Sequence, residues 1–277
     1  MLQKFIEKEE KLIKDIRATR EIIPRNPSQS LRIYRSHSSF TVKLEIHDSD
    51  ENCLHFLVLQ LDDVGIRYKI KRHSLPHGVL FNSLNTLSEY AEEFLRHIAR
   101  LSYFMNGFRL LDLQATVVEP QHKSLSDKYR IFLLRERIFV KISFEPATAS
   151  SYEDLKVKFI GPQEQIIDLE KNLKQENADG YSNLYQNLLK ILEVDRFPEN
   201  FLASEHKNCA ICMEYLDEND KTPIYCCNNL MCDINFHHEC ILKWWLNLKT
   251  SNNFHDVVKG ECPNCKTFLE VNKNCDI

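Results

Sequence analysis

The sequence has no long apolar run, and its basic residues are not clustered. No stretch of about 18 apolar residues occurs in the 277 residues, so we expect no membrane span. Residues 1–200 carry 29 Lys and Arg against 29 Asp and Glu, and residues 201–277 carry seven Lys, no Arg and eleven acidic residues. Neutralising a phosphate backbone requires clustered Lys and Arg. The charge pattern therefore argues against direct nucleic-acid binding.

Cysteine is nearly absent from the first 200 residues, where Cys53 stands alone, whereas eight of the ten cysteines lie between Cys209 and Cys265. The N-terminus, MLQKFIEKEEKLIKDIRATR, lacks the uninterrupted apolar core of a signal peptide, so we expect the chain to stay in a reducing compartment. Thiolates there bind metal rather than pair as disulfides. The clustering therefore predicts a local metal site in preference to a disulfide framework.

The first 115 residues combine helical and strand-like patterns. Apolar residues at helical spacing predict a helix over residues 2–22. A capping-box signature, Thr86 with Glu89, begins a second helix whose apolar stripe reaches Met105. We expect that helix to pack on its own sheet rather than in a coiled coil. Period-two alternation between the helices predicts four antiparallel strands, which begin at residues 31, 40, 53 and 66.

The order of sheet followed by helix is repeated after VVEP at residues 117–120. Further strands begin at residues 129, 137 and 155, and a helix lies near residues 182–193. We therefore predict an α+β fold with three domains. These are a first α/β sandwich with the N-terminal helix (1–115), a second sandwich (116–200) and a cysteine-rich domain (205–271).

The cysteine-rich segment contains eight metal ligands at metal-binding spacing. In chain order, the pairs are Cys209 and Cys212, Cys227 and Cys232, His237 and Cys240, and Cys262 and Cys265. Eight ligands make two closed tetrahedral sites, and a closed site has no open position on which to activate water. We therefore predict two structural Zn²⁺ ions, in preference to an iron–sulfur cluster or free thiols.

The ligand pattern resembles the cross-brace modules of the RING and PHD families, in which the first and third pairs share one ion and the second and fourth pairs share the other. The resemblance implies that the first zinc is bound by Cys209, Cys212, His237 and Cys240. It implies that the second is bound by Cys227, Cys232, Cys262 and Cys265. Cys226 and His238 are left over, and we expect them to pack beside the sites or to be exposed.

The order of the ligands favours a PHD module, because the imidazole stands fifth. A PHD reader of histone tails, however, typically has Trp two residues before the seventh ligand, where this chain has Gly260. A RING module binds a ubiquitin-conjugating enzyme through three apolar positions near its ligands. The resemblance to that family puts Ile211, Trp244 and Pro263 at these positions. These residues favour a RING-type ubiquitin ligase over a histone-tail reader or a zinc-stabilised scaffold.

Two further residues extend the RING interpretation. Trp244 and Trp245 are adjacent on a helix after Cys240, so they cannot both face one core, and we expect one of them to be exposed. In many RING modules a cation after the last cysteine bridges ubiquitin and the conjugating enzyme. Lys266 is the candidate for that role here, although an ordinary surface lysine fits the position equally well.

Five stretches, VVEP, LLKILEVDRFP, CAIC, FHHECILKWWL and FHDVVKGECPNC, resemble in the same order those of the Fanconi anaemia group L family. The resemblance implies a substrate-binding double RWD-like region, followed by a RING with PHD-like ligand order. It also implies a charged conjugating enzyme of the T type, monoubiquitination of the Fanconi group D and I proteins at DNA interstrand crosslinks, other core-complex subunits as partners, and a nuclear and cytoplasmic location. The family usually has a further N-terminal domain, which we expect this chain to lack.

Overall fold

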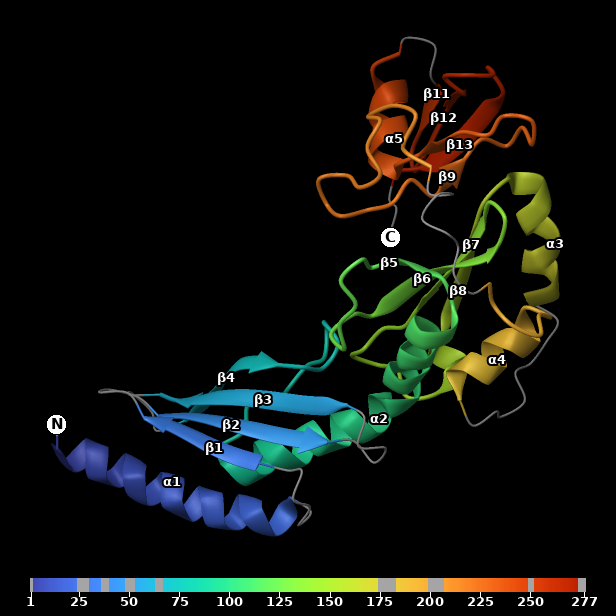
Figure 1. The fold of residues 1–277 in the computed structure, drawn as a ribbon. Coiled ribbons are helices and arrows are strands. Elements are labelled where there is room, and N and C mark those ends of the chain that lie inside the picture. Colours follow the sequence, from blue (N-terminus) through green and yellow to red (C-terminus); the bar gives the residue numbers. More distant parts are fainter. Residues whose placement is uncertain are drawn as a thin grey trace. The chain divides into compact units, whose positions relative to one another are not determined.

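The computed structural model contains two compact units (Figure 1). The first unit comprises residues 1–102 and 145–150, and the second comprises residues 103–144 and 151–277. The described residues are 2–23, 30–35, 40–47, 53–62, 67–173, 183–198, 207–248 and 252–273.

The first unit contains a four-stranded antiparallel meander in the order β1-β2-β3-β4. Its strands are β1 (Ser30–Arg35), β2 (Phe40–His47), β3 (Leu54–Leu61) and β4 (Tyr68–His73). Alternate side chains of β2, from Phe40 through Val42 and Leu44 to Ile46, are buried. The predicted period-two pattern therefore forms one buried face. The fourth strand starts at Tyr68, and residue 66, where we predicted its start, lies outside the described residues.

Two helices carry the predicted helical patterns, α1 (Leu2–Ile22) and α2 (Leu87–Gln114). The capping box of α2 is formed, because Thr86 Oγ1 accepts from the Glu89 amide (3.2 Å) and Glu89 Oε2 accepts from the Thr86 amide (3.0 Å). The Tyr90 hydroxyl donates to the Tyr68 carbonyl (3.3 Å), so α2 packs on its own sheet as predicted. The helix runs beyond Met105, since buried Phe108 and Leu111 continue its apolar stripe.

The second unit contains another antiparallel meander, in the order β5-β6-β7-β8. Its strands are β5 (Val117–Glu119), β6 (Tyr129–Arg135), β7 (Ile138–Ser143) and β8 (Lys156–Ile160). A 3₁₀ turn (Tyr152–Asp154) and the helices α3 (Gln163–Leu173) and α4 (Leu184–Ile191) complete this region. Phe104 of α2 stacks on Phe144 (ring centroids 4.3 Å apart). We call this region, residues 103–144 and 151–198, the second lobe.

The rest of the second unit is the cysteine-rich domain, residues 207–273, of which 207–248 and 252–273 are described. Its elements are β9 (Tyr225–Cys226), β10 (Asn235–Phe236), α5 (His238–Leu246), β11 (Asn252–Phe254), β12 (Val257–Glu261) and β13 (Phe268–Asn272). Strands β9 and β10 pair with each other, and β11-β12-β13 form a three-stranded sheet. The apolar spacing after Cys240 predicted α5, whereas neither this sheet nor α3 was predicted.

The α+β class is confirmed, with two sheet-and-helix regions followed by a small domain. The predicted boundary at residues 115/116 falls at the end of α2, whereas the division into compact units falls inside that helix, at 102/103. No helix among the described residues is long and apolar enough to cross a membrane.

The close approach of α2 and α4 yields a test of the second lobe. A Cβ added at Gly107 would lie 2.3 Å from Leu184 Cβ, and Leu184 is fully buried. Replacing Gly with Ala inside a helix normally stabilises by about 1 kcal/mol, but overpacking typically costs about 1–3 kcal/mol. Because this contact is so short, we expect Gly107→Ala to destabilise the chain by about 1–2 kcal/mol in urea unfolding.

Asn106→Ala is the matched control, because it raises helix propensity at a half-buried neighbouring position. It should leave the urea midpoint unchanged or raise it. A Gly107→Ala midpoint at or above that of the control would contradict the close packing of α2 on α4.

Candidate metal centres

The eight predicted ligands form two groups in the structure. Within each group the candidate ligand atoms all lie within 4.8 Å of one another. The first group is Cys209, Cys212, His237 and Cys240. The second is Cys227, Cys232, Cys262 and Cys265. Each group takes one pair from a C-x-x-C turn and one pair from the middle of the domain, which is the interleaving that the cross-brace resemblance implied.

Both C-x-x-C turns adopt the same tight backbone conformation. The Met213 amide donates to the Cys209 carbonyl (2.8 Å), and the Lys266 amide donates to the Cys262 carbonyl (3.1 Å). Met213 (φ 64°) and Lys266 (φ 65°) each follow the second cysteine of a turn in the left-handed region, which non-glycine residues rarely adopt. Such a conformation persists where the surroundings impose it, and here it closes the turn that aims two sulfurs at one point.

In the first group, a hydrogen bond on the side of the ring that faces away from the cysteines fixes the orientation of His237. Its Nε2 lies 3.1 Å from the Tyr215 carbonyl oxygen, which can only accept a hydrogen bond. Nε2 therefore carries the proton, and the lone pair of Nδ1 faces the sulfurs of Cys212 (3.3 Å) and Cys240 (3.7 Å). The His237 amide also lies 3.4 Å from the Cys209 sulfur and donates to it. The imidazole is thus oriented as a ligand through Nδ1.

The second group is made of four sulfurs. Cys227 and Cys265 sulfurs are 3.4 Å apart, and Cys232 and Cys262 sulfurs are 3.8 Å apart. Zinc–sulfur bonds of about 2.3 Å at tetrahedral angles place sulfurs roughly 3.8 Å apart. The spacing therefore fits a tetrahedral thiolate site. The Asn229 amide also donates a hydrogen bond to the Cys227 sulfur (3.4 Å), which favours the thiolate form.

Individual thiols of these groups differ in acidity, even within one group. Burial, followed by the neighbouring Cys209 thiolate, raises the pKa of Cys240 to about 12, and burial also raises the pKa of Cys227 and Cys262. A hydrogen bond with Thr267 lowers the pKa of Cys265 to about 6. Binding a cation therefore has to displace protons from the buried thiols, so metal affinity falls as the pH is lowered.

The donor sets Cys₃His and Cys₄ fit closed tetrahedral zinc sites. The surrounding core is small, and buried Phe236, Ile241, Trp245, Val258, Leu269 and Val271 pack around the sulfurs. A metal in each group would join segments that are distant in the sequence and stabilise the domain directly. With four protein ligands in each group, neither group offers an open position for substrate.

Cys226 and His238, which were left over in the sequence, belong to neither group. The Cys226 sulfur lies 3.6 Å from the Ile224 carbonyl oxygen, and burial raises its pKa. His238 Nε2 lies 2.7 Å from the Asn272 carbonyl oxygen and therefore donates to it, and the ring packs against Tyr225 with centroids 5.1 Å apart. Both side chains pack beside the groups, as expected.

The two adjacent tryptophans face opposite environments. Trp245 is fully buried, and its Nε1 donates to the Glu261 carbonyl (2.9 Å). A Cβ at Gly260 would lie 2.5 Å from the Trp245 ring, so the indole occupies the space that any side chain at position 260 would need. Trp244 on the other side of α5 is 43% exposed. The expectation that one tryptophan is exposed is confirmed.

The remaining predicted residues border the two ligand groups. Ile211 directly precedes Cys212 in the first C-x-x-C turn and is half-buried, and Pro263, which directly follows Cys262 in the other turn, is also half-buried. Lys266 is exposed, and its Nζ donates to the Pro263 carbonyl (3.2 Å). Glu119 and Arg137 of the second lobe contact this domain and were not predicted, because a single charged residue at the end of a strand or in a hairpin turn has no diagnostic sequence pattern.

Two models of one protein family match most of the second compact unit. The model described as FANCL UBC-like domain 3 matches residues 103–200, and the FANCL C-terminal domain matches residues 205–274. The crystal structure of FANCL matches with a TM-score of 0.71 at 26% identity, over 88% of this chain and 67% of that chain. The chain belongs to the FANCL family.

Two curated relatives of the FANCL family are named E3 ubiquitin-protein ligases. The Drosophila melanogaster protein is 27% identical over 233 residues, which are 78% of this chain and 60% of that protein. The Mus musculus protein is 27% identical over 197 residues, which are 69% of this chain and 51% of that protein. The chain thus spans between about half and three fifths of the relatives' length.

Adjacent residues test the ligand assignment. We expect Cys227→Ser and His237→Ala each to lose at least one of two bound metal ions, because each removes a ligand of a four-membered group. Their neighbours provide matched controls, and Cys226→Ser and His238→Ala should retain both ions. Mass spectrometry of the purified chains gives the number of ions and identifies the element. Loss of an ion from a control, with full occupancy in its neighbour, would reverse the assignment.

Proposed function

We propose that this chain is a RING-type ubiquitin ligase whose two metal groups hold Zn²⁺. Membership of the FANCL family and the ligase names of two curated relatives support the proposal. The observation that carries it is the exposure of Trp244 on α5, beside a tryptophan that is fully buried. An exposed large aromatic side chain on a rigid, metal-stabilised domain is a suitable central contact for a protein partner.

The proposed partner surface combines Trp244 with Ile211 and Pro263. Each of the last two lies between the cysteines of a C-x-x-C turn, so metal binding fixes its backbone. Aliphatic and aromatic side chains on fixed backbone lose little conformational freedom on binding. This surface binds the loops of a ubiquitin-conjugating enzyme that carries ubiquitin as a thioester.

The chain acts by positioning rather than by forming a covalent intermediate. Among the described residues, the cysteines outside the metal groups are Cys53, which is buried, and Cys226, whose pKa is raised by burial, so neither is suited to attack a thioester. The metal groups, each with four ligands, activate no water. The rate enhancement comes instead from holding the charged conjugating enzyme in the arrangement in which a substrate lysine reaches the thioester.

The substrate docks on the RWD-like lobes, and the product is a monoubiquitinated protein. The family resemblance supports a conjugating enzyme of the T type, the Fanconi group D and I proteins as substrates, other core-complex subunits as partners, and a role in crosslink repair in the nucleus and cytoplasm. Lys266 is proposed as the cation that bridges ubiquitin and the conjugating enzyme. Its side chain is exposed and needs only to leave the Pro263 carbonyl to do so.

A histone-tail reader is the competing function, because the imidazole is the fifth ligand in chain order. The position at which PHD readers typically carry Trp is Gly260, and the Trp245 ring fills the space beside it. An aromatic side chain at position 260 would therefore require repacking of the domain core. This observation favours the ligase.

Discharge of ubiquitin from a charged conjugating enzyme to free lysine tests the proposed surface. We expect Trp244→Ala and Ile211→Ala to reduce the stimulated discharge rate by about tenfold or more, because each removes a central contact. Both variants should keep the metal content of the parent chain. Phe254→Ala is the matched control, since Phe254 is 60% exposed on β11 of the same domain, and it should leave the rate unchanged.

Full discharge activity of the Trp244→Ala chain would contradict the proposed surface. Titration of histone-tail peptides distinguishes the competing function. Micromolar peptide binding, together with no stimulation of any conjugating enzyme in a panel, would reverse the choice.

A further inference from the structure

The cysteine-rich domain shares a small apolar core with the second lobe. Ile224 is 3% exposed and packs with Val118 of β5, Ile131 of β6 and Ile160 of β8. Tyr225 and Tyr129 flank this cluster. The two regions therefore share buried apolar side chains, in agreement with their grouping in one compact unit.

Glu119, at the end of β5, places a buried carboxylate at this boundary. Its side chain is 1% exposed and accepts hydrogen bonds from the Thr222 amide (2.8 Å) and hydroxyl (2.9 Å). Lys221 Nζ lies 3.2 Å from the same carboxylate and 2.7 Å from the Tyr129 hydroxyl. Burial lowers the pKa of Lys221, but the bond to Tyr129 and the charge of Glu119 raise it above its ordinary value. A buried carboxylate requires such partners, so Glu119 fixes the 221–222 segment.

Arg137, in the β6–β7 hairpin, contacts the loop that carries two ligands of the second metal group. Its guanidinium donates to the carbonyls of Cys227 (2.7 Å), Cys232 (3.1 Å) and Leu230 (3.2 Å). One arginine thus satisfies three backbone acceptors of a loop whose thiols face inward to the metal group. We call residues 227–232 the ligand loop.

Arg137 is the second residue of the two-residue turn that joins β6 and β7, a turn that commonly takes a positive φ. Arg137 has a φ of 61°, in the left-handed region that favours glycine. Gly161 permits a close approach, because a Cβ there would lie 2.8 Å from the Arg137 carbonyl oxygen. Strained positions of this kind persist where surrounding interactions hold them, and they mark candidates for function.

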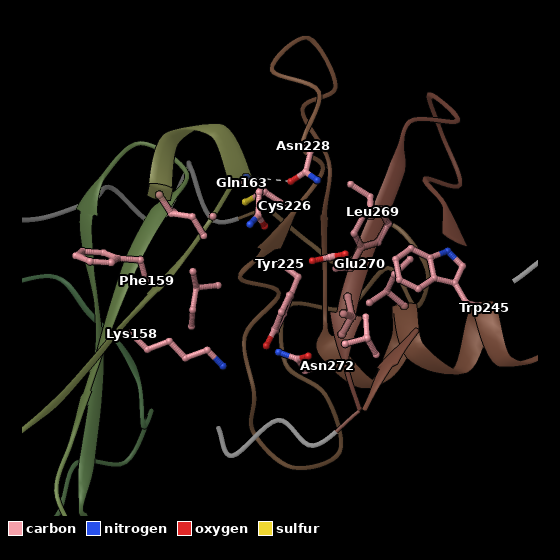
Figure 2. A pocket seen from close by; sticks show the side chains of 17 residues that line it. Lys158, Phe159, Gln163, Tyr225, Cys226, Asn228, Trp245, Leu269, Glu270 and Asn272 are labelled. Atoms are coloured by element: carbon pink, nitrogen blue, oxygen red, sulfur yellow. Dashed lines mark hydrogen bonds between the residues drawn. The ribbon is translucent and has the colours of Figure 1, made fainter. Parts of the chain in front are cut away.

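The ligand loop is also contacted by the start of α3. Asn228 Oδ1 accepts a hydrogen bond from the Gln163 amide (3.1 Å), as the dashed line in Figure 2 shows. The first amides of a helix lack partners within the helix, so Asn228 caps α3 from the cysteine-rich domain. Beside this bond, a cavity of about 160 Å³ separates β8 from β13 and interrupts the packing (Figure 2). The orientation of the domain therefore depends on the anchors around the cavity.

We propose that Arg137 is a positioning residue. By holding the ligand loop, it orients the proposed partner surface of the cysteine-rich domain relative to the second lobe, and Glu119 is a second anchor. The inference rests on the proposed ligase function and deepens it. With both metal groups filled, Arg137 is not required for thioester discharge itself, which needs only the metal-bound domain. It contributes to the transfer of ubiquitin to a substrate docked on the lobes, and to the choice of lysine.

Arg137→Ala in the full chain tests the proposal against Arg135→Ala. The control removes an exposed arginine with the same charge from the same hairpin. We expect Arg137→Ala, but not the control, to speed amide hydrogen exchange in the ligand loop and at Gln163 by about tenfold or more. Discharge to free lysine should stay within about twofold of the parent chain, whereas transfer to the Fanconi group D and I pair should fall by about tenfold.

Site selectivity separates positioning from a general loss of stability. Mass spectrometry of the modified substrate should show ubiquitin spread over additional lysines in Arg137→Ala. Glu119→Gln, which keeps an oxygen to accept from Thr222 but loses the charge facing Lys221, should give a smaller effect in the same direction.

Two outcomes would overturn the proposal. An equal fall in discharge and transfer, in chains with both metal groups filled, would show that Arg137 supports the domain itself rather than its orientation, and unchanged transfer and lysine choice would show that orientation is not limiting. Absence of discharge by the parent chain would instead contradict the ligase function. In that case the exchange rates in Arg137→Ala and Arg135→Ala would still decide whether Arg137 anchors the ligand loop.

Discussion

The cysteine-rich domain depends on the convergence of eight donor atoms into two groups. The domain has a small apolar core, and its chain makes tight turns with non-glycine residues in the left-handed region at Met213 and Lys266. Metal bonds in these groups would supply the stabilisation that a larger core would otherwise provide. Because the groups interleave along the chain, each metal ion would fix segments on both sides of the other group, and the domain would fold as one unit.

This convergence also determines which tryptophan is exposed. His237 stands directly before α5 and Cys240 lies in its first turn, so both ligands fix the rotation of the helix about its axis. Residues four apart share a helix face. Ile241 and Trp245 therefore face the core, while Trp244 turns outward. The position of a surface aromatic thus follows from the position of two metal ligands, and Gly260 provides the space that Trp245 needs.

Periodic and spaced features of the structure were predictable from the sequence. Alternation predicted the buried face of β2, the capping box predicted the start of α2, and spacing predicted the eight ligands. The missed elements have weaker patterns. Helix α3 buries little, and strands β11–β13 are each only three to five residues long. Glu119 and Arg137 could not be identified, because their partners are backbone groups and side chains about 90 to 103 residues away, and backbone acceptors have no sequence signature.

The ligand loop serves two purposes with opposite faces of one short segment. The Cys227 and Cys232 thiols turn toward the second metal group, whereas the carbonyls of the same residues accept from Arg137. A metal ion in the second group would order the loop with its carbonyls in the positions that Arg137 requires, and the bound guanidinium would in turn restrain the loop in the conformation that binds metal. Two interactions that stabilise the same conformation favour each other. Metal binding and contact with the second lobe would therefore be thermodynamically linked, although no described residue of the lobe belongs to either metal group.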